Sequence, residues 1–360
     1  MKSNHGANLH QLSEELGINE NKIIDFSSNI NPFGLSPKGL ENLKNNLNLA
    51  TIYPDPNYTD LKASISEYCK CNPENIILGS GATELITSSI KVINPQNTLL
   101  LAPAYSEYEK ELKNINSKIT KFFYKKENNF QINIDDIIAL VQKSNFDMII
   151  ICNPNNPTGT LIPLKDIEKL YLNFKKPIMI DETYIEFTDF SKTSAINLID
   201  ICQEIIVIRG TSKFFSTPGI RLGYAIISKG VILDAMSSIP NLWNINIFAD
   251  IMGEAMFKDY DFIRMCHKNF KENFTLLYNG LNKFKDFKVY NSNSNFILCE
   301  ILNSKYNSND LYHFLSKKGI IIRKAESFDN LNNNFFRVCV LTKENIDFLL
   351  QEIYKFIQQY

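Results

Sequence analysis

Short runs of isoleucine, leucine and valine alternate with amphipathic stretches through the first two-thirds of the chain, and this alternation constrains the fold most. The runs expected to form strands are 75–78, 98–101, 148–152, 177–180 and 205–208. Each is followed within two residues by Gly, Pro, Asn or Asp, which interrupt strands. Helices are expected between them, notably over 82–93 and 164–174. Continuously apolar strands that alternate with helices are typical of a parallel sheet covered on both faces, so the pattern predicts an α/β fold.

The last third of the chain has a different pattern. A long helical stretch over 249–281 is followed by short strands and a closing helix over 346–359. The strands expected here are 288–290, 296–300, 320–323 and 335–340. The length of 360 residues suits two domains. We therefore expect a large domain over 45–245 with a mostly parallel sheet, and a smaller α+β domain formed by 1–44 and 246–360.

Composition narrows the class of function. The formal net charge is −1, from 38 basic and 39 acidic residues that are interspersed, so we expect no nucleic-acid partner and no attraction to an anionic membrane. Residues 1–20 show no apolar signal segment, and no apolar run approaches the roughly 18 residues that span a bilayer. Seven scattered cysteines, of which only Cys69 and Cys71 are close, predict reduced thiols in a cytoplasmic protein and no metal site.

Two segments have the composition of an anion site. Gly79-Ser80-Gly81-Ala82-Thr83 joins a predicted strand to a predicted helix. Free N–H groups and the helix dipole at such a turn bind phosphate, although a glycine-rich turn is often only a turn. The second segment is 218–223. It contains Arg221, whose guanidinium could bind a phosphate through two hydrogen bonds.

A lysine and an acid follow two of the buried strands. Lys213, in Thr211-Ser212-Lys213, is unusual at this place because lysine is normally solvated. A desolvated lysine loses its proton readily and can form a Schiff base. Asp181 could hold a pyridine nitrogen protonated, with Tyr184 in reach of the same ligand. A surface lysine and a helix-capping aspartate are the alternatives.

A loop that turns sharply, Asn153 to Gly159, completes the set. Asn156 in this loop could donate a hydrogen bond to an oxygen on the same ring. The loop also contains two prolines and a glycine, so a purely structural rigid turn is the alternative interpretation.

In this order, the motifs resemble those of pyridoxal 5'-phosphate (PLP) enzymes of the aspartate-aminotransferase-like fold, fold type I, over nearly the whole chain. The resemblance implies that Lys213 carries the cofactor and moves protons at the substrate Cα, and that Asp181 pairs with the ring nitrogen. It also implies a homodimer, because Tyr53 matches a tyrosine lent by the partner subunit. The other residues that it assigns to the cofactor are Gly81, Ala82, Thr83, Tyr105, Asn156, Tyr184, Thr211, Ser212 and Arg221.

One position departs from the cofactor pattern. The family usually has Ser or Thr three residues before the lysine, where it holds the phosphate, and this chain has Gly210. The neighbouring hydroxyl groups of Thr211 and Ser212 are the two candidates to replace it.

Within the family, the chain resembles the branch that contains histidinol-phosphate aminotransferases and threonine-phosphate decarboxylases, whose substrates are small amines with a phosphate. The N-terminal pattern His5-Gly6-Ala7-Asn8, followed by 25–32 (Asp-Phe-Ser-Ser-Asn-Ile-Asn-Pro), favours the decarboxylase, although a second arginine common there is Leu341 here. Transamination with 2-oxoglutarate and a non-catalytic PLP sensor are the alternatives. The substrate contacts that the resemblance implies are His5, Gly6, Asn29, Asn156, Arg323 for the phosphate and Arg337 for the carboxylate.

Overall fold

The larger of two main sheets forms the centre of the structure, a computed structural model that describes residues 8–239 and 242–360. Its seven strands lie in the order β2-β8-β7-β6-β5-β3-β4. Only β8 is antiparallel to its neighbours, β2 and β7. The strands are β2 Ile76–Gly79, β3 Asn97–Ala102, β4 Lys118–Phe123, β5 Met148–Cys152, β6 Ile178–Asp181, β7 Ile205–Gly210 and β8 Gly223–Ile227. This arrangement confirms the predicted α/β class with a mostly parallel sheet.

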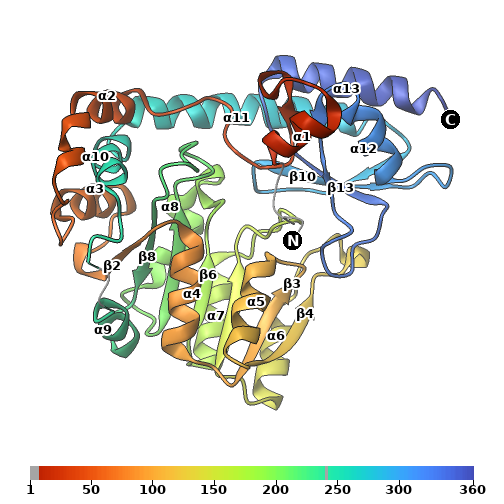
Figure 1. Cartoon of the computed structure of the whole chain (residues 1–360). Helices are drawn as coiled ribbons and strands as arrows, with labels where there is room; N and C mark the ends of the chain where they lie inside the picture. The colour runs from red at the N-terminus through yellow and green to blue at the C-terminus, as the bar shows by residue number, and fades with distance from the viewer. Residues whose placement is uncertain (1–7, 240–241) are drawn as a thin grey trace.

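Helices cover both faces of this sheet, which explains the continuously apolar strands (Figure 1). All residues of β5 are buried. Met148 and Ile150 pack with the helices of one face, whereas Ile149 and Ile151 pack with those of the other. The first face carries α4 Ala82–Ile93, α5 Ser106–Asn114 and α9 Val231–Ser237, and the second carries α6 Ile134–Lys143 and α7 Leu164–Phe174.

The smaller sheet is antiparallel, with the order β12-β13-β10-β9. Its strands are β9 Phe287–Val289, β10 Phe296–Ile301, β12 Arg323–Lys324 and β13 Phe335–Cys339. A parallel pair, β1 Ile24–Asp25 and β11 Ile320–Ile321, joins the N-terminal segment to this part of the chain. The domain limits at residues 45 and 245 stay a prediction.

The single helix expected over 249–281 is two helices in the structure. These are α10 Ile247–Met256 and α11 Tyr260–Leu281, and the chain turns between them. Asp259 caps α11 through Phe262 N and also accepts a 2.7 Å hydrogen bond from Ser36 Oγ. Figure 1 shows α11 running from the side of α2 to the small sheet. The remaining helices are α1 Leu9–Leu16, α2 Pro37–Asn45, α3 Thr59–Cys69, α8 Phe190–Thr193, α12 Ser308–Ser316 and α13 Lys343–Ile357.

Across the two described ranges, none of the helices combines the length and the apolar character that a bilayer crossing requires.

Candidate active site

A cavity of about 370 Å³ lies between the carboxyl ends of the large-sheet strands and the small sheet. It brings together twelve of the residues singled out from the sequence: Asn29, Ala82, Thr83, Tyr105, Asn156, Asp181, Tyr184, Ser212, Lys213, Arg221, Arg323 and Arg337. His5 and Gly6 lie outside the described residues. The motifs after separate strands therefore converge on one site, as expected for a parallel sheet.

Lys213 is held at the cavity by the N-terminal segment. Its Nζ donates a 2.7 Å hydrogen bond to the carbonyl of Ser28, and the backbone carbonyl of Lys213 accepts one from Asn31 N at 3.0 Å. Burial, assisted by the positive charge of Arg337, lowers the pKa of Lys213 from 10.5 to about 8. Part of the population therefore has a neutral, nucleophilic amine near neutral pH.

Asp181 ends β6 and is 5% exposed. Its Oδ2 accepts a 2.5 Å hydrogen bond from the hydroxyl of Tyr108, and Oδ1 accepts from Thr183 Oγ1 at 2.5 Å. Burial raises the pKa of this carboxyl, while these bonds act in the opposite direction. Sequence reasoning missed Tyr108, although its place three residues after Tyr105, in the first turn of α5, was a usable signal.

The predicted anion site lies at the N-terminus of α4. Gly81 has φ +89°, and a Cβ there would lie 2.5 Å from Arg221 Nη2, so a side chain would displace the guanidinium. Arg221 Nη2 donates to the carbonyl of Ser80 at 3.1 Å. The hydroxyl groups of Thr83 and Tyr105 are 3.5 Å apart in the same corner. A helix terminus, a guanidinium and two hydroxyls thus surround one space suited to a phosphate.

Of the two hydroxyl groups that could replace the one missing at Gly210, only that of Ser212 lines the described cavity. Thr211 is buried and donates to the carbonyl of Leu222 at 3.0 Å, with the Thr217 hydroxyl at 2.8 Å, so it does not line the cavity. Ser212 does line it. A Cβ at Gly210 would meet only Ala82, at 3.4 Å or more, so the space for a small side chain is present.

Two arginines face the cavity from paired positions of β12 and β13, Arg323 opposite Arg337. Arg337 donates to Asn156 Oδ1 and, at 2.6 Å, to the carbonyl of Ser27, while its buried Nε has no hydrogen-bond partner among the described residues. Burial lowers the pKa of Arg337, and burial together with the nearby Arg337 charge lowers that of Arg323 to about 10. A buried arginine beside a half-buried one favours an anionic ligand.

The segment 27–31 crosses the cavity. Asn29 has φ +59° and donates to the Tyr184 hydroxyl at 3.2 Å, and its carbonyl accepts from Asn295 at 2.8 Å. The Asn29 Oδ1 atom is buried and has no hydrogen-bond partner within residues 8–239 and 242–360. Burial raises the pKa of Tyr184, so its hydroxyl stays protonated. A polar ligand would satisfy the open Asn29 atom, which is otherwise costly to leave buried.

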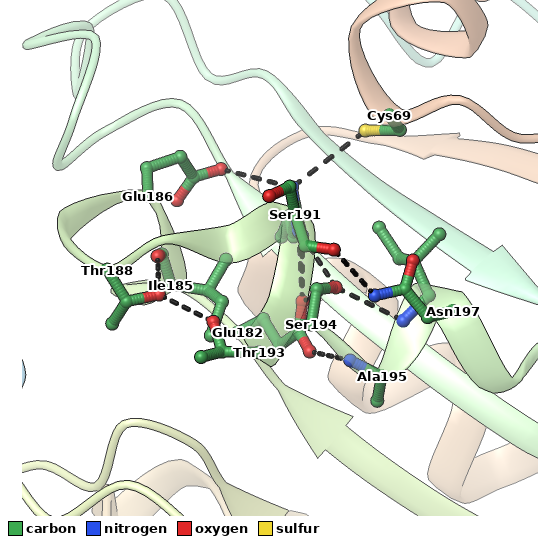
Figure 2. Close-up of polar contacts among 12 residues, drawn as sticks. Cys69, Glu182, Ile185, Glu186, Thr188, Ser191, Thr193, Ser194, Ala195 and Asn197 are labelled. Carbon is green, nitrogen blue, oxygen red and sulfur yellow. Dashed lines mark hydrogen bonds and ion pairs between the residues drawn. The ribbon is translucent and has the colours of Figure 1, made fainter. Parts of the chain in front are cut away.

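A buried ion pair ties together the strands that carry Asp181 and Lys213. Arg209, on β7, is 1% exposed and donates to Glu182 Oε2 at 2.9 Å. Figure 2 shows Glu182 beside Ser194, whose hydroxyl donates to the same carboxylate at 2.7 Å. Because Glu182 follows Asp181 and Arg209 precedes Lys213 by four residues, this pair fixes the two strand ends relative to each other.

Tyr53, which was predicted to contact the cofactor, lies away from the cavity of its own chain. It is 72% exposed, does not line the cavity and stacks on Trp243 with ring centroids 4.3 Å apart. Gly81 is not itself a lining residue either, although its neighbour Ala82 is.

The fold and this site define a class of enzyme. The family model for aminotransferases of class I and II matches residues 21–353, and the chain belongs to that family, which depends on PLP.

Individual relatives carry two different names. A histidinol-phosphate aminotransferase of Methanococcus maripaludis is 31% identical over 96% of this chain and 93% of its own. A putative threonine-phosphate decarboxylase of Caldanaerobacter subterraneus is 33% identical over 88% of this chain and 86% of its own. The crystal structure of the histidinol-phosphate aminotransferase from Clostridium acetobutylicum superimposes with a TM-score of 0.87 at 32% identity, covering 93% of this chain and 99% of that one.

Proposed function

We propose that the chain binds PLP in this cavity and acts on a small phosphorylated amine, most specifically as a decarboxylase of L-threonine O-3-phosphate. Bound PLP supplies an aldehyde that condenses with amines and a ring that accepts electrons from the substrate Cα. The site fits such a group, because an amine of lowered pKa, a buried carboxylate and a phosphate corner surround one cavity.

Each cofactor group has a residue to hold it in this proposal. Lys213 would bind the aldehyde carbon, and Asp181 would face the ring nitrogen. Asn156 and Tyr184 would contact the ring hydroxyl, and Tyr105 would lie against the ring. The phosphate would lie in the corner formed by Gly81, Ala82, Thr83, Ser212 and Arg221, with Ser212 replacing the hydroxyl that Gly210 lacks.

The chain's own residues would then decide which bond at Cα breaks. Arg337 would hold the substrate carboxylate and Arg323 the phosphate, and anchoring both ends fixes the rotation of the substrate. Lys213 would also move a proton at Cα. Segment 27–31, tied to Tyr184 and Arg337, would reduce access of water.

The pair Arg323 and Arg337 is the observation that carries the decarboxylase proposal. L-Threonine phosphate has a carboxylate and a phosphate, which match two adjacent guanidinium groups. Histidinol phosphate has only the phosphate. The names of several relatives favour the second candidate, an aminotransferase that uses histidinol phosphate and 2-oxoglutarate. In the aminotransferase reaction, Arg337 would bind a carboxylate of 2-oxoglutarate.

Two assays separate these candidates. Holoprotein is supplied with L-threonine phosphate and no keto acid, and CO2 is measured. Separately, it is supplied with histidinol phosphate and 2-oxoglutarate, and glutamate is measured. We expect CO2 and aminopropanol phosphate from the first assay. Glutamate without CO2 would replace the decarboxylase by the aminotransferase, and neither product would refute both.

The exposed Tyr53 supports a homodimer in which each subunit lends this tyrosine to its partner's cofactor. A complementation experiment tests this proposal. Tyr53→Ala and Lys213→Ala chains, each of low activity alone, are unfolded, mixed and refolded together. Mixed dimers would contain one complete site, so activity should return. Mixing that restores no activity, or a fully active monomer, would contradict the proposal.

A further inference from the structure

The turn that joins β12 to β13 reaches over the cavity. Ser327 and Phe328, which sequence reasoning did not single out, both line it. Arg323 Nη2 donates a 2.9 Å hydrogen bond to Ser327 Oγ, and the guanidinium carbon lies 5.5 Å from the centre of the Phe328 ring. Two side chains of the turn therefore hold one face and one nitrogen of Arg323.

The next residue of the turn is bound to the large sheet. Asp329 Oδ2 lies 2.8 Å from Lys121 Nζ on β4, and the same ammonium lies 2.6 Å from Glu109 Oε2 on α5. The Lys121 side chain is 21% exposed and that of Asp329 is 42% exposed, so solvent screens this bridge substantially but not fully. The helix α5 begins directly after Tyr105, which also lines the cavity.

We propose that the turn Ser327–Asp329 is a specificity-determining element that sets the reach of Arg323, and that the Asp329–Lys121 bridge holds it in place. This inference rests on the proposed function, in which Arg323 receives the substrate phosphate. The element would act on affinity for the phosphate end of the substrate and not on the bond-breaking step, because the hydrogen bonds of Lys213 and Asp181 within the described residues go to Ser28, Tyr108 and Thr183 and not to this turn.

The physical reason is preorganisation. An arginine side chain with free rotation loses conformational entropy when it binds an anion, and a side chain already held in place loses less. Ser327 and Phe328 restrict Arg323, and the bridge restricts the turn relative to the large sheet that holds the reacting groups. A partly exposed ion pair and one hydrogen bond each contribute little alone, so the expected change in affinity is about three- to tenfold.

Ser327→Ala and Asp329→Asn test the proposal in the holoprotein. The dissociation constant for L-threonine phosphate is measured from the change in cofactor absorbance, with unphosphorylated L-threonine as the comparison. Both variants should weaken binding of the phosphorylated amine about three- to tenfold and leave that of L-threonine within twofold. Turnover at saturation should change less than twofold. Asp329→Glu should recover much of the loss.

Two controls make the result specific. Asp135→Asn removes an Asp–Lys bridge of 2.5 Å to Lys169 between helices α6 and α7, outside the cavity, and should change neither affinity. Arg323→Gln tests the proposed function separately. If Arg323→Gln weakens phosphate binding and the turn variants do not, only this inference is wrong. If Arg323→Gln has no effect, or no phosphorylated amine binds, the proposed role of Arg323 has failed and the inference fails with it.

Discussion

Glu186 is a buried carboxyl beside the Arg209–Glu182 ion pair, and its burial gives stability a pH dependence of known sign. The side chain is 2% exposed, and Oε1 lies 3.7 Å from Arg209 Nη1. The other oxygen, Oε2, has no hydrogen-bond partner in the part of the chain that the structure describes. Burial raises the pKa of Glu186 from 4.5 to about 7, with the charge of Arg209 acting in the opposite direction. Figure 2 draws Glu186 and Glu182 among the polar contacts of this region.

The size of the effect follows from linkage. Between pH 4.5 and about 7 the folded protein binds more protons at this site than the unfolded chain, so stability falls as pH rises through that window. At about 1.4 kcal/mol for each pH unit between the two pKa values, ionised Glu186 costs the folded state about 3 kcal/mol. Glutamine cannot ionise and has nearly the shape of protonated glutamate. Glu186→Gln should therefore gain about 2 to 3 kcal/mol more in unfolding free energy at pH 8 than at pH 5.

The measurement is urea unfolding of wild-type and Glu186→Gln holoprotein at both pH values, followed by circular dichroism at equal protein and cofactor concentrations. Glu272→Gln, on an exposed face of α11, is the matched control and should give no pH-dependent gain. A gain that is equal at the two pH values, or larger at pH 5, would refute the assignment of a raised pKa to Glu186.

Further predictions concern the cofactor site. Lys213→Ala should abolish the visible absorbance of bound PLP, which an unchanged spectrum would contradict. Gly210→Ser places a hydroxyl beside Ala82, where there is room, and should tighten PLP binding several-fold, about 1 kcal/mol, in equilibrium dialysis; weaker binding would contradict the proposed phosphate position. The rate of PLP uptake by apoprotein should rise with pH with a midpoint at about 8. Arg337→Gln should move that midpoint upward because it removes a neighbouring positive charge, and a lower midpoint would contradict this.

The buried parallel core could be predicted from the sequence because burial on both faces leaves a strong local pattern. The helix expected over 82–93 and the strand over 148–152 have the same limits in the structure. Edge strand β4 was missed, because it is not fully buried and its lysines, including Lys121, interrupt the apolar pattern. The break before α11 was also missed. Asp259 at this break accepts a hydrogen bond from Ser36, which lies 223 positions away in the sequence, so this contact leaves no local pattern.

The site was predictable where a motif follows a strand, and less so where contacts are tertiary. Asp181 and Lys213 each follow a buried strand, so topology alone brings them to one edge of the sheet. The bond from Lys213 to the Ser28 carbonyl spans 185 positions and uses a backbone atom that any residue would supply. The contact of Ser327 with Arg323 depends on the shape of one turn. No residue pattern indicates either contact.

Reduction of the holoprotein with borohydride, followed by peptide mapping, tests the central claim most directly. The reagent fixes the cofactor on whichever amine holds it. We expect a single pyridoxyl group, on the peptide that contains Lys213. A label on another lysine, or a chain that binds no PLP, would contradict the proposed active site.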